Sequence, residues 1–337
     1  MPQLRKDPIL GRWVIMSTER KQRPSDFQME PQPAQPAQLC PFCTGNESKT
    51  PPEILAYREE GSLRDKPGWH VRVIPNRVPV LRVEGQLERR GLGMYDMITG
   101  VGAHEIIIET PKHDVDIADL SPVQIERLLW AYRDRSIDLS RDQRFRYILI
   151  FRNRGVSAGG VVSHPHSQLI ATPIVPRRVE EEIGGAKLYY SYKERCIFCD
   201  MIRQEVVERK RVVTENRNFL AFEPFAPRFA FETWVMPKFH ACSFPLVDSE
   251  QITDLAYCLK ETLVRIKEVL GDRPYNYVIH TAPMPLKDQD AYHWHIEVLP
   301  KLARVAGFEW GSGFYINSTL PEDAAELLRA AELPTAV

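Results

Sequence analysis

The feature that most constrains this chain is an internal repeat, in which cysteine pairs and histidines recur in the same order. Each half carries a Cys-x-x-Cys pair followed by two histidines: Cys40, Cys43, His113 and His164 in the first half, and Cys196, Cys199, His240 and His293 in the second. The two histidines are 51 residues apart in the first half and 53 residues apart in the second. Short apolar strands can match by chance, but metal-ligand residues that keep one order and one spacing favour a duplication. We therefore predict two units, residues 1–185 and 186–337.

The segments between these residues repeat in type as well. Short apolar runs at 105–110 and 233–237 are typical of buried strands. Each run is followed by a helical pattern, and the first helix is expected to begin with Ser121 as N-cap and Pro122 at its first position. Further strand-like runs follow at 145–151 and 275–283. Both halves are thus expected to contain strands and a helix in one common order.

The two ligand sets predict two metal sites. A Cys-x-x-Cys turn presents two sulfur atoms to one ion, and two imidazoles complete a closed Cys2His2 shell, which is a usual structural zinc arrangement. We predict zinc at both sites, with iron as an alternative at the second. A redox-active pair or simply buried thiols would explain one such motif, but two pairs with matching histidines favour metal. Cys242 and Cys258 are interpreted as ordinary small apolar residues.

Composition limits the classes of partner. Lys and Arg number 44 and Asp and Glu number 45, so the chain has no global field that would attract nucleic acid or an acidic membrane. No apolar run approaches the length that spans a bilayer, and the N-terminus has no signal-type apolar block. We expect a cytoplasmic protein with no nucleic-acid partner and no membrane partner, in which close cysteine pairs bind metal rather than form disulfides.

The segment Ser163-His164-Pro165-His166-Ser167-Gln168 carries most of the chemistry. Alternate residues of an extended segment point to the same side, so His164, His166 and Gln168 are expected to share a face. A neutral imidazole is a competent nucleophile toward phosphorus, and the glycines at 155, 159 and 160 allow backbone amides to approach a phosphate. These residues predict covalent catalysis on a phosphate ester.

The H-x-H-x-Q motif, with the upstream Cys-Pro-Phe-Cys and the downstream His-Trp-His, resembles the galactose-1-phosphate uridylyltransferase branch of the histidine-triad superfamily. The resemblance runs from about residue 7 to 317. It implies an α+β fold built from two histidine-triad-like halves, each an antiparallel sheet with packed helices, assembled as a homodimer. The hydrolase branch has a third histidine where this chain has Gln168, which favours transfer over hydrolysis. Ser167 and the second Cys-x-x-Cys resemble ADP-glucose phosphorylase relatives more closely.

Carried over by position, the resemblance makes His166 the nucleophile and Gln168 a ligand of the phosphoryl oxygens. It implies substrate contacts from a set spread along the chain: Arg20, Arg23, Asn76, Asn153, Gly159, Gly160, Phe308 and Glu309. The predicted activity is uridylyl transfer between UDP-glucose and a hexose 1-phosphate such as galactose 1-phosphate, in a ping-pong reaction. The alternatives are an ADP-glucose phosphorylase or adenylyltransferase that uses the same histidine, and a nucleotide-binding protein without turnover. His280 and His295 are interpreted as core histidines or as ligands of a different metal arrangement.

Overall fold

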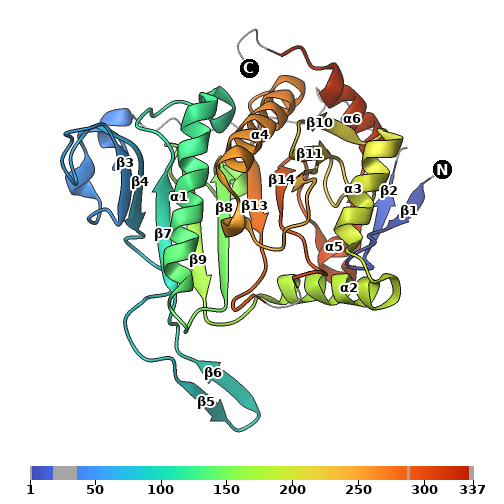
Figure 1. Ribbon diagram of the computed structural model, residues 1–337, viewed down its shortest axis with the longest axis horizontal. Helices are drawn as coiled ribbons and strands as arrows, with labels where there is room; N and C mark the ends of the chain where they lie inside the picture. The colour runs from blue at the N-terminus through green and yellow to red at the C-terminus, as the bar shows by residue number, and fades with distance from the viewer. Residues whose placement is uncertain (1, 18–35, 287–288, 334–337) are drawn as a thin grey trace.

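The computed structural model describes residues 2–17, 36–286 and 289–333, which form a mixed α and β structure (Figure 1). Its centre is one ten-stranded sheet, in the order β10-β11-β12-β14-β13-β8-β9-β7-β4-β3. In chain order the strands are β3 (Leu55–Arg58), β4 (Trp69–Pro75), β7 (Ala103–Ile108), β8 (Tyr147–Arg154), β9 (His166–Thr172), β10 (Val212–Glu215), β11 (Phe219–Phe222), β12 (Thr233–Pro237), β13 (Tyr275–His280) and β14 (His295–Pro300). Every neighbouring pair is antiparallel.

The two middle strands join the first and second halves of the chain. Tyr275 of β13 pairs with Arg154 of β8, and the register continues to Ile279 opposite Ile150. An unpaired strand edge exposes a row of N–H and C=O groups, and this pairing satisfies them on both strands. The antiparallel sheet of each half, which the family resemblance implied, therefore joins the other edge to edge in one continuous sheet.

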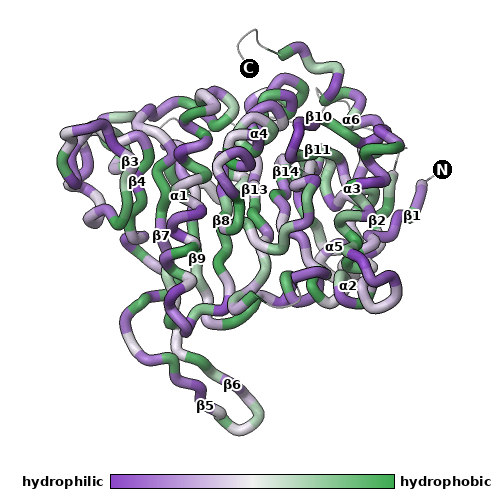
Figure 2. The backbone as a smooth tube through the Cα atoms, in the orientation of Figure 1, coloured by the Kyte–Doolittle hydropathy of each residue, from purple (hydrophilic) through white to green (hydrophobic). Residues whose placement is uncertain are grey.

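Six helices pack around the sheet: α1 (Pro122–Ser140), α2 (Arg177–Lys193), α3 (Ile197–Glu208), α4 (Ser249–Leu270), α5 (Gly307–Ser312) and α6 (Pro321–Ala330), counted over the described part of the chain. Helices α1 and α4 lie side by side across the central strands, and the hydrophobic segments gather in the strands behind them (Figures 1 and 2). Leu129 of α1 and Leu259 of α4 are buried in one core cluster that includes residues of β8, β9, β13 and β14. This cluster extends across both halves.

The expected start of α1 is confirmed. The Ser121 hydroxyl accepts from the backbone N–H of Gln124 with Pro122 at the first helical position, and Asp248 forms a capping box with Gln251 at the start of α4. The α+β class is also confirmed. Ala37–Leu39 forms a short 3-10 turn directly before Cys40.

Two small elements lie outside the main sheet. Strands β1 (Gln3–Lys6), β2 (Trp13–Met16) and β15 (Tyr315–Asn317) form a three-stranded sheet at the edge of the second half. The hairpin of β5 (Arg89–Leu92) and β6 (Tyr95–Ile98) projects away from the body of the molecule (Figure 1). No described helix is both long and apolar enough to cross a membrane.

Candidate active site and metal centres

Strand β9 places the predicted catalytic residues on the face of the sheet opposite α1. His166 pairs with Ile108 and Gln168 pairs with Ile106 of β7. Leu169, the next residue along β9, lies in the core cluster under α1. Because side chains alternate along a strand, His166 and Gln168 share the other face, as the sequence predicted. Both residues line a cavity of about 360 Å³ together with Phe42 and Asn76.

The His166 ring is held in a defined tautomer. Its Nδ1 lies 2.8 Å from the backbone carbonyl oxygen of His164. A carbonyl can only accept, so Nδ1 carries the proton and Nε2 carries the free lone pair. Burial lowers the pKa of His166 to about 4, which keeps the ring neutral at physiological pH. The ring also contacts Phe42, with the two centroids 5.4 Å apart. The arrangement presents an uncharged, oriented nitrogen nucleophile.

Ser167 points to the opposite face of the strand and is fully buried. Its hydroxyl bonds to the Glu109 carboxylate and lies 3.3 Å from the hydroxyl of Tyr277, and Tyr132 bonds to both hydroxyls. Glu109 in turn receives the Arg152 guanidinium at 3.0 Å. Ser167 therefore fastens β9 to α1, β8 and β13. Its side chain has no part in the cavity at His166.

The glycine turn after β8 is held by a residue of the second half. Asn276 donates from Nδ2 to Oδ1 of Asn153 and to the backbone carbonyl of Ala158, both at 2.8 Å. Gly159 has a φ of +86°, and a Cβ on Gly160 would lie 2.7 Å from the carbonyl oxygen of Asn153. Glycine is thus required at both positions. Asn153 and Gly160 line a second cavity beside His166, of about 420 Å³, and Gly159 lines the first.

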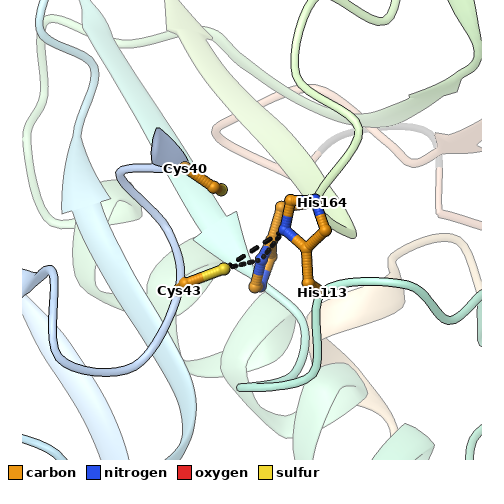
Figure 3. Close-up of side chains that lie close together, drawn as sticks. All are labelled: Cys40, Cys43, His113 and His164. Atoms are coloured by element: carbon orange, nitrogen blue, oxygen red, sulfur yellow. Dashed lines mark hydrogen bonds between the residues drawn. The ribbon is translucent and has the colours of Figure 1, made fainter. Parts of the chain in front are cut away.

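The structure brings the four predicted ligands of the first metal site together (Figure 3). Cys43 Sγ lies 3.2 Å from Nδ1 of His113 and 3.5 Å from Nδ1 of His164, and the two nitrogens are 3.4 Å apart. A tetrahedral ion with metal–sulfur bonds of about 2.3 Å and metal–nitrogen bonds of about 2.0–2.1 Å separates its ligands by roughly these distances. His164 Nε2 lies 2.8 Å from the Thr110 carbonyl, which leaves Nδ1 free to bind a metal. The donor set and its spacing fit a metal ion.

The second predicted site has the same construction. Its ligand atoms, from Cys196, Cys199, His240 and His293, all lie within 4.8 Å of one another. Cys199 Sγ is 3.3 Å from Nδ1 of His240 and 3.6 Å from Nδ1 of His293. Both histidines again turn Nε2 toward a backbone carbonyl, that of Gln289 at 2.8 Å and that of Pro237 at 3.0 Å. The repeat of the sequence is thus a repeat of ligand geometry.

His280 and His295 belong to a third cluster, which sequence reasoning did not assemble. It joins Glu182 of α2, His280 of β13, and His295 and Glu297 of β14, all of them buried. His280 lies 3.1 Å from Glu182 and 3.4 Å from Glu297, and Arg228 also pairs with Glu297. Burial alone would lower the pKa of His280, but the two carboxylates outweigh it and raise the pKa to about 10. A protonated histidine and an arginine therefore balance the carboxylates, which favours the interpretation as core histidines.

This third cluster occupies the position in the second half that corresponds to His166, the predicted nucleophile, in the first. His295 follows His293 as His166 follows His164, and its Nδ1 lies 3.2 Å from the His293 carbonyl. Its ring, however, stacks on His280 and Trp234, with centroids 4.6 Å and 4.9 Å away, and contacts Phe198. The signal available in the sequence was the repeat itself, because Glu297 aligns with Gln168. The second copy of the pocket is filled by side chains.

The remaining predicted residues lie elsewhere. Arg20 and Arg23 fall outside the described residues. Phe308 and Glu309 are in α5, where Phe308 packs against Phe314 and Glu309 accepts from the Ala306 amide. Neither is among the described residues that line the two cavities at His166. Cys242 and Cys258 are buried, and neither belongs to the metal-ligand clusters found in the described chain.

Two family models cover almost the whole chain. The N-terminal domain of galactose-1-phosphate uridyl transferase matches residues 1–176, and the C-terminal domain matches residues 182–335. The chain is 38% identical to ADP-glucose phosphorylase of Arabidopsis thaliana over 98% of its own length and 93% of that protein. It is 30% identical to a galactose-1-phosphate uridylyltransferase of Thermotoga maritima over 99% of both chains.

Solved structures give the same grouping. The structure of the Arabidopsis ADP-glucose phosphorylase with bound ADP-glucose has a TM-score of 0.83 and 35% identity, covering 99% of this chain and 100% of that one. A uridylyltransferase structure has a TM-score of 0.76 and 32% identity, covering 98% of each chain. The relatives are transferases that share this fold over its full length. The chain is therefore a transferase and belongs to the galactose-1-phosphate uridylyltransferase family.

Proposed function

We propose that the protein transfers a nucleoside monophosphate from a nucleotide sugar to a phosphate acceptor through a covalent adduct on His166. The observation that carries the proposal is the hydrogen bond from His166 Nδ1 to the His164 carbonyl, which directs a free lone pair on Nε2 from a ring that lines the cavity. Gln168 lies on the same face and lines the same cavity, as a group that contacts a phosphoryl oxygen must. A structure with this ring and this cavity is better suited to turnover than to binding alone.

The reaction proceeds in two displacements at phosphorus. The Nε2 lone pair of His166 attacks the α-phosphorus, the bond from that phosphorus to the bridging oxygen breaks, and a hexose 1-phosphate leaves with the electron pair. An oxygen of the acceptor phosphate then attacks the same phosphorus, and the phosphorus–nitrogen bond breaks. The Nδ1 proton stays on His166 throughout, because its hydrogen bond to the His164 carbonyl is kept in the free and the nucleotidylated ring. The amide of Gln168 contacts a non-bridging oxygen without exchanging a proton.

Two donors are candidates. The family suggests UDP-glucose with a hexose 1-phosphate such as galactose 1-phosphate as acceptor. ADP-glucose with inorganic phosphate is the second candidate, and the higher identity to the Arabidopsis ADP-glucose phosphorylase, 38% against 30%, favours it. Ser167, whose side chain faces the core, supports neither base.

We also propose zinc at both Cys2His2 sites, because two thiolates and two imidazoles suit that ion. Zinc at the first site would hold His164, whose carbonyl orients the nucleophile, but takes no part in the bond changes. A homodimer remains part of the proposal, since Phe308 and Glu309, which the family resemblance assigns to the closed site, lie apart from His166 within one chain. The cytoplasmic location and the unit boundary at residue 185 stay predictions.

The decisive experiment combines intact mass with isotope exchange. The protein is incubated with UDP-glucose or ADP-glucose alone, acid-quenched under conditions that preserve phosphoramidates, and weighed; the added mass identifies the nucleotide. Exchange of labelled glucose 1-phosphate into the same donor reports the first displacement. His166→Ala should keep both metals and lose adduct and exchange, whereas His164→Ala should also lose the metal of the first site. Exchange that persists in His166→Ala would refute the nucleophile.

A further inference from the structure

One buried histidine contacts Gln168 and has no part in the chemistry described so far. His104 of β7 lies two strand positions from Ile106, the residue opposite Gln168, and its Nε2 is 2.9 Å from Gln168 Oε1. The sequence motif did not include it, because its distance from Gln168 is 64 residues along the chain. Alternation along β7 puts residues 104, 106 and 108 on one face, and the register between β7 and β9 puts that face on the side of His166.

The backbone fixes the tautomer of this ring. The amide N–H of Val80 points to His104 Nδ1 at 3.2 Å. A backbone amide can only donate, so Nδ1 must accept and the ring proton sits on Nε2. The protonated Nε2 can then donate only to an oxygen, which is Oε1 of Gln168. With its oxygen held in this way, the carboxamide turns its NH2 group away from His104.

The neighbouring Asn76 also lies close to His104 Nε2. Its Oδ1 accepts from the Val78 amide at 2.9 Å, so its nitrogen is the end that lies 3.0 Å from His104 Nε2. With Nε2 protonated both nitrogens are donors and form no hydrogen bond with each other, so the Nε2 proton is directed to Gln168 Oε1. Asn76 lines the same cavity as His166 and Gln168.

We propose that His104 is a positioning residue, which holds Gln168 with its amide hydrogens facing the reacting phosphate. The inference rests on the proposed function, because it assigns the orientation of a group that acts on that phosphate. In the opposite tautomer Nε2 would accept a hydrogen bond, so the Gln168 amide nitrogen would face the ring. The Gln168 oxygen would then face the anionic phosphoryl group. The amide oxygen would then repel the phosphoryl oxygens, whereas the amide hydrogens in the proposed orientation donate to them.

The test is a double-mutant cycle on the exchange reaction. His104→Ala should lower kcat for exchange on the order of tenfold or more, with a smaller change in KM. The reason is that a Gln168 amide without a fixed orientation stabilises the transition state less well. Adding His104→Ala to Gln168→Ala should cost nothing further, since the histidine acts through that side chain. His104→Gln, which keeps an N–H donor, should recover part of kcat.

A second pair of variants addresses the tautomer and does not touch the ring. Val80→Pro removes the amide hydrogen that faces Nδ1, and Val80→Ala keeps it; the Val80 side chain itself is exposed. We expect kcat of Val80→Pro to fall toward that of His104→Ala, and Val80→Ala to serve as the matched control. Metal content and thermal midpoint are measured for every variant.

The outcomes separate this inference from the proposed function. Additive losses in the double variant, or an unchanged kcat in His104→Ala, would overturn the role of His104 while leaving the His166 adduct intact. Failure of the wild-type protein to form an adduct with either donor would overturn the proposed function, and the positioning role with it. If His104→Ala does not fold, His104→Gln and the two Val80 variants decide. Equal kcat values for Val80→Pro and Val80→Ala would reject the assignment.

Discussion

Among single residues, His280 is a buried histidine whose pKa two neighbouring carboxylates raise. It is buried among ionisable groups from three sides: Glu182 and Arg178 of α2, His295 and Glu297 of β14, and Arg228 and Tyr292. Its folded pKa of about 10 lies above the unfolded value of about 6.5. The folded state therefore binds a proton that the unfolded state releases, and the stabilisation present below pH 6.5 is lost as pH rises through 10.

We accordingly predict that the free energy of unfolding of the wild-type protein decreases between about pH 7 and 10, with a slope of up to about 1.4 kcal/mol per pH unit from this group. His280→Gln should be less stable at pH 7 and show a flatter profile. Urea unfolding at fixed free zinc measures both. Parallel profiles for the two proteins would mean that His280 is not protonated in the fold.

The residues that the sequence identified are those whose geometry follows from one segment. His166 and Gln168 share a face because a strand repeats every two residues, and each Cys-x-x-Cys forms one turn. His104 and Glu182 could not be placed in this way, because their contacts depend on the register between β7 and β9 and on how α2 packs over β13 and β14. Register and packing are settled by the whole fold.

At the level of elements, the first metal site fastens the loop of Cys40 and Cys43, and the second fastens the start of α3, to segments that flank strands of the sheet. Only the first site is connected to His166, the proposed nucleophile. Cys43→Ser should lose one of the two metal equivalents and also slow exchange, because His164 supplies the carbonyl that orients His166. Cys199→Ser should likewise lose one equivalent and lose stability, while the rate of the folded fraction is kept. Metal analysis and single-turnover exchange give the two readouts, with Cys258→Ala as a control that retains both metals. Equal loss of rate in both serine variants would show that the sites are coupled.

Strands and helices themselves were largely predictable, since β-branched runs and capping residues are local signals. The pairing of β8 with β13 was not, because the sequence of a strand does not say which edge it will meet. The antiparallel strands of each half were predicted, and their joining edge to edge through β8 and β13 was not.

For the whole molecule, the shared core predicts a single cooperative unit. Leu129 of α1 is fully buried in the cluster that spans both halves. Leu129→Ala should lower the free energy of unfolding by about 2–5 kcal/mol, the usual cost of such a cavity. Calorimetry at constant free zinc should still show one transition for the variant and for the wild type. Two separated transitions would mean that the halves unfold independently despite the common sheet.

The filled pocket around His295 has a consequence for how the ancestral duplication was used. Once the second half no longer needed a cavity at His295, stacked rings and buried ion pairs could occupy that position without loss of turnover. The second half also supports the cavity of the first, because Asn276 donates hydrogen bonds to Asn153 and Ala158 of the glycine turn. The two halves therefore differ in structure at equivalent positions: one has an open cavity at His166, and the other has a packed core at His295.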